Sequence, residues 1–226
     1  MSSEVRSQLA PTGVLRAAIN MGNFLLVTGK TASGDPDGVS PDMARELARR
    51  LEVDCQLVPF ATPGELADAA ADDVWDIGNI GAEPERAKTI AFTAAYVEIE
   101  ATYIVPAGSP IQSIEEVDQL GNRISVSARS AYELWLSDNI QKAELKLAQG
   151  LDGSLDLFIE EKLEALAGLR PRLITDIEKL PGARILDGQF TAVQQAMGTK
   201  PDRVAAASYL RDFVEEMKAN GFVKGL

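Results

Sequence analysis

The chain has 226 residues, with 22 Lys or Arg, 34 Asp or Glu and no histidine, so its formal net charge is −12 at pH 7. A strongly negative molecule repels nucleic acid phosphates and anionic lipid headgroups, which argues against both as partners. Without histidine, and with Cys55 as the single cysteine, the usual zinc, copper and haem ligand sets, histidine-dependent catalytic triads and an internal disulfide are excluded. No apolar run approaches the roughly 20 residues of a membrane helix, so no membrane insertion is expected.

Short apolar runs alternate with helical patterns along the first half of the chain, which is typical of an α/β fold. A helix is expected to begin at Ser40 and Pro41, because Ser40 can cap the first turn and Pro41 needs no donor there. Its expected buried face is Met43, Ala44, Leu47, Ala48 and Leu51. The other elements expected here are strands at 13–20, 53–57, 75–80 and 101–105, a helix at 63–71, and a short helix starting at Pro84 with Glu83 as its cap.

The segment 106–110 holds the densest run of turn-forming residues and predicts a domain boundary. The elements expected beyond it are a Ser113–Glu116 capping box, strands at 123–127, 163–167, 183–186 and 192–199, a helix at 130–143 packing Leu134, Ile140 and Trp135, and a final helix at 201–220. The last helix is long and amphipathic, so it is expected to return to the first sheet. The sequence therefore predicts one lobe of residues 1–106 plus 196–226 and a second lobe of residues 107–195.

The order of these motifs resembles the type II periplasmic binding protein fold, and within it the family 3 solute-binding proteins typical of polar amino-acid uptake. The segments that carry the resemblance are 13–20, 38–44, Trp75-Asp76 leading to Glu85-Arg86, and 91–96. The resemblance implies two α/β lobes with mixed sheets, joined by two crossover segments, that close around a ligand held in the cleft between them.

Arg86 is the principal candidate for ligand binding. In the family this arginine binds a ligand carboxylate, and a guanidinium presents paired donors that match the two carboxylate oxygens. The alternative is that Arg86 only pairs with Glu83, three residues earlier. Gly81 stands where the family usually has a threonine, and Asn79 and Ala82 are candidates for backbone contacts there.

The second lobe departs from the family pattern. Leu169 stands where the family has the aspartate that neutralises a ligand α-amino group, so a standard α-amino acid in the standard pose would leave an ammonium unpaired. Arg129 and Arg170 are candidate cationic contacts, with solvent-facing charge as the alternative for each. Ser130 and the amide of Ala131 lie at an expected helix N-terminus and can bind an anion.

Aromatic and polar residues of the first lobe are further candidates for ligand binding. Phe24 and Phe60 are candidates for an aromatic wall, with core packing as the alternative, and Asn20 either binds the ligand or shapes a turn. The candidate ligand-binding residues are Arg86, Ser130, Arg129, Ala131, Asn79, Gly81, Asn20, Phe24, Phe60 and Arg170. No catalytic residue, metal ligand or cofactor is expected.

These features predict a monomeric solute-binding protein that captures a small organic anion, an amino acid or a related carboxylate, as the receptor of an ABC-type uptake system with a permease as its partner. One alternative is a lyase of the same fold, resembling cyclohexadienyl dehydratase, with Glu83 or Glu164 as general acid. Another is a cytoplasmic ligand-sensing or sequestering module. The first ten residues show no leader pattern, so a periplasmic location is expected if a leader was removed and a cytoplasmic one if Met1 is the native start.

Overall fold

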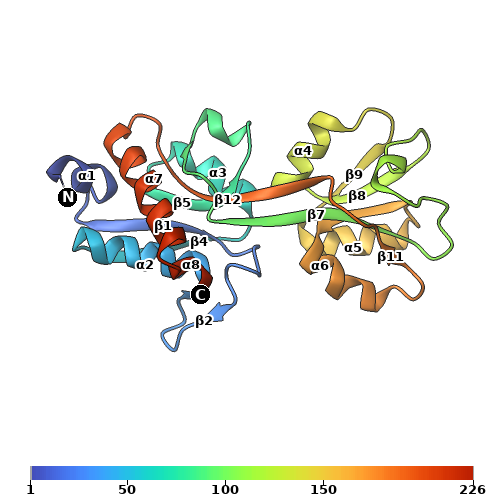
Figure 1. The fold of residues 1–226 in the computed structure, drawn as a ribbon, viewed down its shortest axis with the longest axis horizontal. Coiled ribbons are helices and arrows are strands. Elements are labelled where there is room, and N and C mark those ends of the chain that lie inside the picture. Colours follow the sequence, from blue (N-terminus) through green and yellow to red (C-terminus); the bar gives the residue numbers. More distant parts are fainter. Residues whose placement is uncertain (1, 226) are drawn as a thin grey trace. The chain divides into compact units, whose positions relative to one another are not determined.

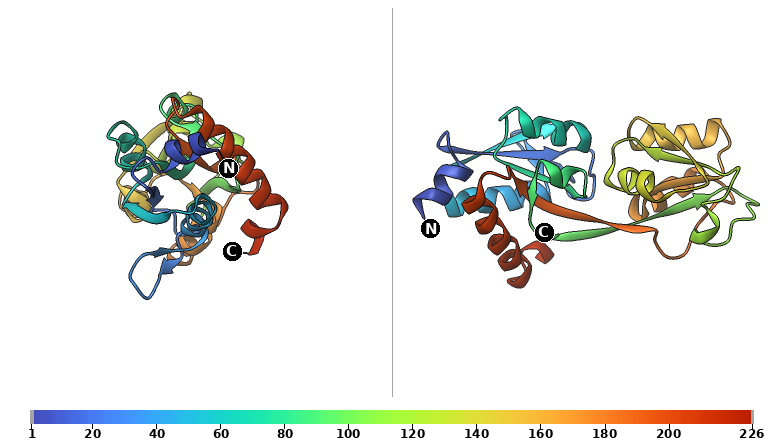
Figure 2. Two further views of the ribbon diagram at one scale, coloured as in Figure 1. Left: turned by 90° about the vertical axis from the view of Figure 1, so that its left-hand side faces the viewer. Right: turned by 90° about the horizontal axis from the view of Figure 1, so that it is seen from above.

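The computed structural model describes residues 2–225 and divides the chain into two compact units. Unit 1 comprises Met1–Val97 and Gln194–Leu226, and unit 2 comprises Glu98–Val193. The chain crosses between them twice, in β7 (Val97–Val105, green) and β12 (Thr191–Thr199, orange), and both termini belong to unit 1 (Figures 1 and 2). The turn-rich segment 106–110 follows directly after the end of β7. Unit 2 already begins at Glu98, at the start of this strand.

Unit 1 is built on a mixed sheet in the order β4-β1-β5-β12. Its strands are β1 (Val14–Asn20), β4 (Asp54–Phe60), β5 (Ile77–Ala82), the end of β12, and the short β6 (Ala91–Phe92) beside β12, and β2 (Gly29–Lys30) and β3 (Pro36–Asp37) form a separate hairpin. Strand β1 runs parallel to β4 and β5, whereas β12 runs antiparallel to β5.

Helices cover both faces of this sheet. On one face, α2 (Val39–Leu51) and α7 (Val204–Ala219) pack around Leu15, Ile77 and Met197. On the other face, α3 (Pro63–Asp68) and the 3-10 turn η1 (Ala69–Ala71) pack around Ala18, Trp75 and Ile80. The predicted buried face of α2, from Met43 to Leu51, is confirmed. The remaining elements of unit 1 are α1 (Ser3–Leu9), the 3-10 turn η2 (Arg86–Lys88) and α8 (Phe222–Gly225).

In unit 2 the strands follow the order β7-β10-β8-β9, with parallel and antiparallel pairs. Its strands are β7, β8 (Arg123–Ser127), β9 (Glu144–Ala148), β10 (Ala165–Leu169) and the short β11 (Arg184–Ile185), and its helical elements are α4 (Ala131–Asn139), α5 (Gly150–Glu160), α6 (Arg170–Asp176), η3 (Ile114–Glu116) and η4 (Ile177–Lys179). Helices α5 and α6 pack on the face that carries Ile104 and Leu166. Trp135 of α4 meets Phe190, which stacks on Tyr103, so α4 lies on the opposite face. The α/β class and the mixed sheets predicted from the sequence are confirmed.

Three local predictions are wrong. Helix α2 begins at Val39 after Gly38, and the Ser40 hydroxyl hydrogen-bonds the Tyr96 hydroxyl at 3.0 Å rather than capping the helix. Gly38 adopts φ 129°, and a Cβ there would lie 2.7 Å from Leu26 O, so the backbone decides where this helix starts. The predicted Ser113–Glu116 box does not form, because Glu116 accepts the amide of Gln112 at 2.7 Å.

The expected packing of α4 is wrong in part, since Trp135 contacts Phe190 but is not among the residues that the helix buries. The helix ends at Asn139 and buries Tyr132, Glu133 and Leu136, while Leu134, Trp135 and Ile140 are only half-buried. The reason lies at the helix start, where Ser130 and Glu133 form a polar turn that takes up the inner face.

The first helix, α1, was not expected. It buries Leu9 and Val5 in the core of unit 1. Arg6 Nη2 donates to Glu52 O at the end of α2 (2.9 Å), and Gln8 Oε1 accepts the amide of Ala206 at the start of α7 (2.9 Å). A seven-residue helix is too short to show helical periodicity, and its caps are the neighbouring Ser2, which accepts the amide of Val5, and Ala10.

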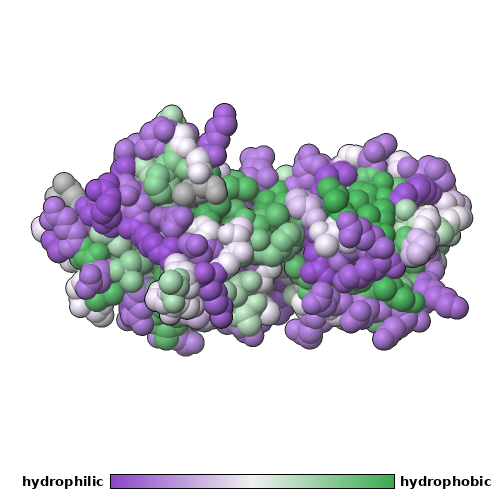
Figure 3. Space-filling view, turned by 90° about the horizontal axis from the view of Figure 1, so that it is seen from below, coloured by the Kyte–Doolittle hydropathy of each residue, from purple (hydrophilic) through white to green (hydrophobic). Residues whose placement is uncertain are grey.

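The surface is mixed in character. On the face drawn in Figure 3, hydrophilic residues predominate and hydrophobic areas remain on both units. None of the helices within residues 2–225 has the length and hydropathy to cross a membrane.

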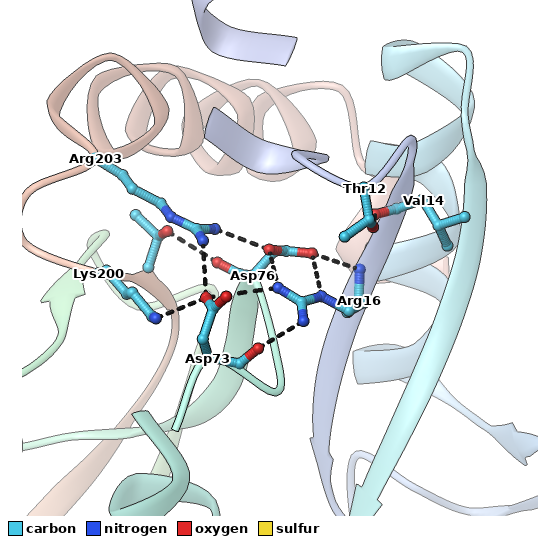
Figure 4. A network of polar contacts seen from close by, with 8 residues as sticks. Thr12, Val14, Arg16, Asp73, Asp76, Lys200 and Arg203 are labelled. Atoms are coloured by element: carbon cyan, nitrogen blue, oxygen red, sulfur yellow. Dashed lines mark hydrogen bonds and ion pairs between the residues drawn. The ribbon is translucent and has the colours of Figure 1, made fainter. Parts of the chain in front are cut away.

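A buried carboxylate joins the distant segments of unit 1 (Figure 4). Asp76 is fully buried, and its carboxylate accepts hydrogen bonds from Arg16 N (3.0 Å), Arg16 Nε (3.0 Å), Arg16 Nη2 (2.8 Å) and Arg203 Nη1 (2.9 Å). Asp73, whose side chain is 62% exposed, adds weaker links to Lys200 and Arg203. The network ties β1, the start of β5 and the β12–α7 connection together.

Removing the Asp76 carboxylate should strongly destabilise unit 1. Asp76→Ala removes the four hydrogen bonds that Arg16 and Arg203 make to a buried carboxylate and leaves these half-buried arginines with their contacts to Asp73, and we expect a loss of about 3–5 kcal/mol in urea unfolding. Asp73→Ala is the control, with an expected loss of about 0–1 kcal/mol because its ion pairs are exposed. Equal losses in the two variants would contradict this role for Asp76.

A second ionic cluster connects α2 to α7. Arg50 donates to both Glu216 oxygens (2.7 and 2.8 Å) and to Glu46 (2.9 Å), and Arg49 donates to both Glu46 oxygens (2.7 and 2.9 Å). The hydrogen bond from Arg49, with that from Arg50, lowers the pKa of Glu46 from 4.5 to about 2.

This lowered pKa predicts an acid-dependent contribution to stability. Since the folded-state pKa of Glu46 lies below its ordinary value, the contribution is complete above about pH 4.5 and is lost as the pH falls toward 2. The difference in unfolding free energy between wild type and Glu46→Gln should therefore shrink over that range in denaturant titrations. Glu98→Gln, which removes an exposed glutamate, controls for the substitution itself and should cost less at pH 7. A difference between wild type and E46Q that is constant with pH would refute the assignment.

Candidate functional site

The parallel strands of unit 1 bring several candidate residues to one edge of the sheet. Asn20 at the end of β1 pairs with Phe60 at the end of β4, and Ile19 pairs with Asn79 of β5. The carboxyl ends of three neighbouring strands therefore meet, which is where open α/β sheets bind ligands. Gly81 and the turn carrying Arg86 follow directly on β5.

Arg86 is held in a fixed position at this edge. Its side chain is only 4% exposed, and Nη1 donates to Gly81 O at 2.7 Å. Glu83 accepts the amides of Arg86 (2.7 Å) and Glu85 (2.8 Å), as expected of a cap, and its carboxylate lies 3.6 Å from Arg86 Nε. The short helix expected from Pro84 is only the 3-10 turn η2, which starts at Arg86. The pairing that was considered as an alternative therefore exists, and it belongs to the same turn that orients the guanidinium.

Asn79 presents an unusual buried group. The residue is 2% exposed, and among the described residues neither Oδ1 nor Nδ2 has a hydrogen-bond partner. Asn79 pairs with Ile19 of β1 and with Met197 of β12, so its backbone lies within the sheet between two strands. Its unpaired groups are therefore the two side-chain amide atoms. A buried amide without partners costs about 1–3 kcal/mol for each unpaired group, and such groups are rare in native structures.

The other candidates of unit 1 differ in their surroundings. Asn20 is buried, and its Oδ1 accepts the amide of Gly22 at 3.1 Å, so it shapes the turn after β1. Phe60 packs against the core cluster around Trp75. Phe24 is 37% exposed.

In unit 2, the segment after β8 forms a polar helix start. Ser130 is the N-cap of α4 and accepts the amide of Glu133 at 3.1 Å, and Glu133 in return accepts the amide of Arg129 at 2.8 Å. Arg129 has φ 59°, a left-handed conformation that turns the chain sharply before the helix. Ala131 is the first helical residue and is half-buried.

Tyr132, which the sequence did not single out, adds a second buried polar group without a partner. It is 3% exposed, and its hydroxyl makes no hydrogen bond within residues 2–225. Burial raises the pKa of Tyr132 to about 12, and the Ser130 and Ser127 hydroxyls lower that pKa by a smaller amount. No sequence signal identifies it, because tyrosine at the start of an amphipathic helix is usually a packing residue.

The end of β10 carries Leu169 and Arg170. Leu169 is 7% exposed, and it presents an apolar side chain where the family resemblance implies an aspartate. Arg170 Nε donates to Glu100 at 2.7 Å, and its Nη2 donates to Gly188 O. The charge of Arg170 is therefore balanced within unit 2.

The two glutamates considered as general acids, Glu83 and Glu164, both hydrogen-bond to other groups of the protein. Hydrogen bonds from Arg123 lower the pKa of Glu164, the reverse of what a general acid at neutral pH requires. Glu83 accepts two backbone amides. Across residues 2–225, no cluster of three or more Cys, Asp or Glu side chains could hold a metal ion.

Comparisons with known proteins agree with this architecture. The histidine-binding periplasmic protein of Escherichia coli (strain K12) is 22% identical over 203 residues, covering 85% of this chain and 78% of that protein. The ancestral amino acid-binding protein AncCDT-1, a precursor of cyclohexadienyl dehydratase, superposes with a TM-score of 0.77 at 18% identity, covering 97% of this chain and 96% of that one.

A third comparison concerns an arginine-bound protein. The amino acid ABC transporter substrate-binding protein AbpA from Streptococcus pneumoniae, bound to L-arginine, gives a TM-score of 0.74 at 20% identity, covering 96% of this chain and 94% of that one. The family model of the bacterial extracellular solute-binding proteins, family 3, matches residues 22–226. The chain therefore belongs to family 3 of the bacterial extracellular solute-binding proteins.

Proposed function

We propose that this protein binds a small molecule bearing a carboxylate, an amino acid or a related acid, and that Arg86 binds the carboxylate. The observation that carries the proposal is the position of Arg86, a buried guanidinium oriented by Gly81 O at the carboxyl edge of unit 1. A planar guanidinium matches a carboxylate through two parallel hydrogen bonds. The relatives named above bind histidine and arginine, both of which carry this group.

The remaining candidates stay part of this proposal. They are Asn20, Phe24, Phe60, Asn79 and Gly81 in unit 1, and Arg129, Ser130, Ala131 and Arg170 in unit 2. Ser130 is supported by its place at the start of a nine-residue helix, where backbone amides favour an anion. Arg170 has the weakest support, since Glu100 already balances its charge.

The biological role follows from the family. We infer that the protein acts as a monomeric receptor of an ABC-type uptake system, delivering its ligand to a membrane permease, and that it works in the periplasm. The periplasmic histidine-binding relative and the ABC transporter component AbpA support this role. A lyase activity lacks support, because Glu164 is paired with Arg123 and Glu83 accepts two backbone amides.

Loss of the Arg86 guanidinium should abolish binding. Amino acids, hydroxy acids and dicarboxylates would be screened by thermal unfolding, where a ligand at about a hundred times its Kd stabilises the protein by about 2.7 kcal/mol. Arg86→Ala should remove every shift, and Arg86→Lys should reduce it because an ammonium cannot make the paired contact. Arg211→Ala, which removes one exposed positive charge, is the matched control and should keep the shifts. An undiminished shift in R86A would disprove the proposal.

Tyr132→Phe should separate a binding role from a folding role. Since the buried hydroxyl has no partner, its removal should leave the unfolding free energy of the ligand-free protein unchanged or raise it by up to about 1–3 kcal/mol. Tyr96→Phe is the matched control, because that buried hydroxyl is bonded to Ser40 and its loss should cost about 1 kcal/mol. If Tyr132 serves the ligand, calorimetry will show weaker binding in Y132F. A loss of stability in Y132F as large as in Y96F would assign Tyr132 to the fold instead.

A further inference from the structure

We propose that Glu83 is a specificity-determining residue of the Arg86 site: its carboxylate positions the guanidinium, and its negative charge disfavours a second negatively charged group on the ligand. This inference rests on the proposed function and narrows its ligand class. It is carried by the contacts of one turn of unit 1, between β5 and η2, in which Glu83 and Arg86 are three residues apart.

The carboxylate of Glu83 fixes both the backbone and the arginine side chain of this turn. It accepts the amides of Glu85 (2.8 Å) and Arg86 (2.7 Å), and its Oε1 lies 3.6 Å from Arg86 Nε. Arg86 Nη1 donates to Gly81 O at 2.7 Å. Contacts at two different nitrogens restrict the rotation of the guanidinium, so Glu83 acts as a positioning residue for Arg86.

The same carboxylate places a negative charge beside the positive one. The side chains of Glu83 and Arg86 are 9% and 4% exposed, so water screens this pair weakly. A ligand carboxylate hydrogen-bonded to the guanidinium at about 2.8 Å would lie within about 9 Å of the Glu83 oxygens. Glu83 therefore cancels much of the attraction that Arg86 would otherwise exert on a second negative group of the ligand.

A purely structural cap would not require this charge. Serine and asparagine cap helical turns as well as an acidic residue does, because capping needs only an acceptor. In this turn the acceptor is a nearly enclosed carboxylate, 3.6 Å from the arginine proposed to bind the ligand. The charge of Glu83 therefore acts on whatever Arg86 binds, in addition to the hydrogen bonds that hold the turn.

The test compares acids that differ in the number of carboxylates. Isothermal titration calorimetry would measure each acid that stabilises the wild type in thermal unfolding beside its analogue with one carboxylate more or fewer, such as asparagine and aspartate, glutamine and glutamate, or succinamate and succinate. Glu83→Gln keeps the shape and one acceptor but removes the charge, so it should shift the ratio of affinities toward the diacid by about tenfold. Because a looser turn weakens both members of a pair alike, the ratio isolates the charge.

Two further substitutions separate charge from position. Glu83→Ala removes the acceptor as well as the charge, so it should weaken the binding of every acid and still shift the ratio toward the diacids. Glu85→Gln is the matched control, because that side chain is 65% exposed in the same turn and solvent screens its charge. The ratio should change by less than about threefold in E85Q.

Circular dichroism would confirm that each variant is folded. A ratio that is unchanged in both folded Glu83 variants, or that shifts as much in E85Q as in E83Q, would overturn the inference.

The outcomes also separate this inference from the function beneath it. If none of the acids binds, or if R86A binds them as well as the wild type, the proposed function fails. If acids bind through Arg86 and their ratio does not respond to Glu83, the proposed function stands and only the inference about Glu83 fails.

Discussion

The buried carboxylate of Asp76 is the interaction on which unit 1 depends. Unit 1 is assembled from two stretches of chain separated by the whole of unit 2, and Asp76 joins them by binding Arg16 of β1 and Arg203 at the start of α7. Four hydrogen bonds to one fully buried carboxylate offset its desolvation only when all partners are present. The returning strand β12 is thereby fixed beside β5, whose carboxyl end carries the candidate site.

The parallel register is the second constraint. Because β1 lies between β4 and β5 with a continuous register, the strand ends that carry Asn20, Phe60 and Asn79 must lie at one edge. The tight turn after β5 then places Arg86 over Gly81. Binding residues on such turns are positioned by the rigid sheet beneath them, which spares the ligand the entropic cost of ordering them.

Among the described residues, buried side-chain groups without a hydrogen-bond partner belong to Asn79 of β5 in unit 1 and to Tyr132 of α4 in unit 2. A buried polar group without a partner lowers the stability of the fold. Where such a group lies next to a binding site, a ligand that hydrogen-bonds to it gains the free energy of that pairing.

Much of this protein could be predicted from local sequence. The alternation of apolar runs and helical faces determined the α/β class, the buried face of α2 from Met43 to Leu51, and the Glu83 cap, because each depends on residues close together in the chain. Tertiary structure alone decided what involves distant partners: the start of α2 where Gly38 meets Leu26, the caps that α1 supplies, and the ion pair of Arg170 with Glu100. The unpaired states of Asn79 and Tyr132 also arise only there, since whether a buried group finds a partner depends on packing between segments far apart in the sequence.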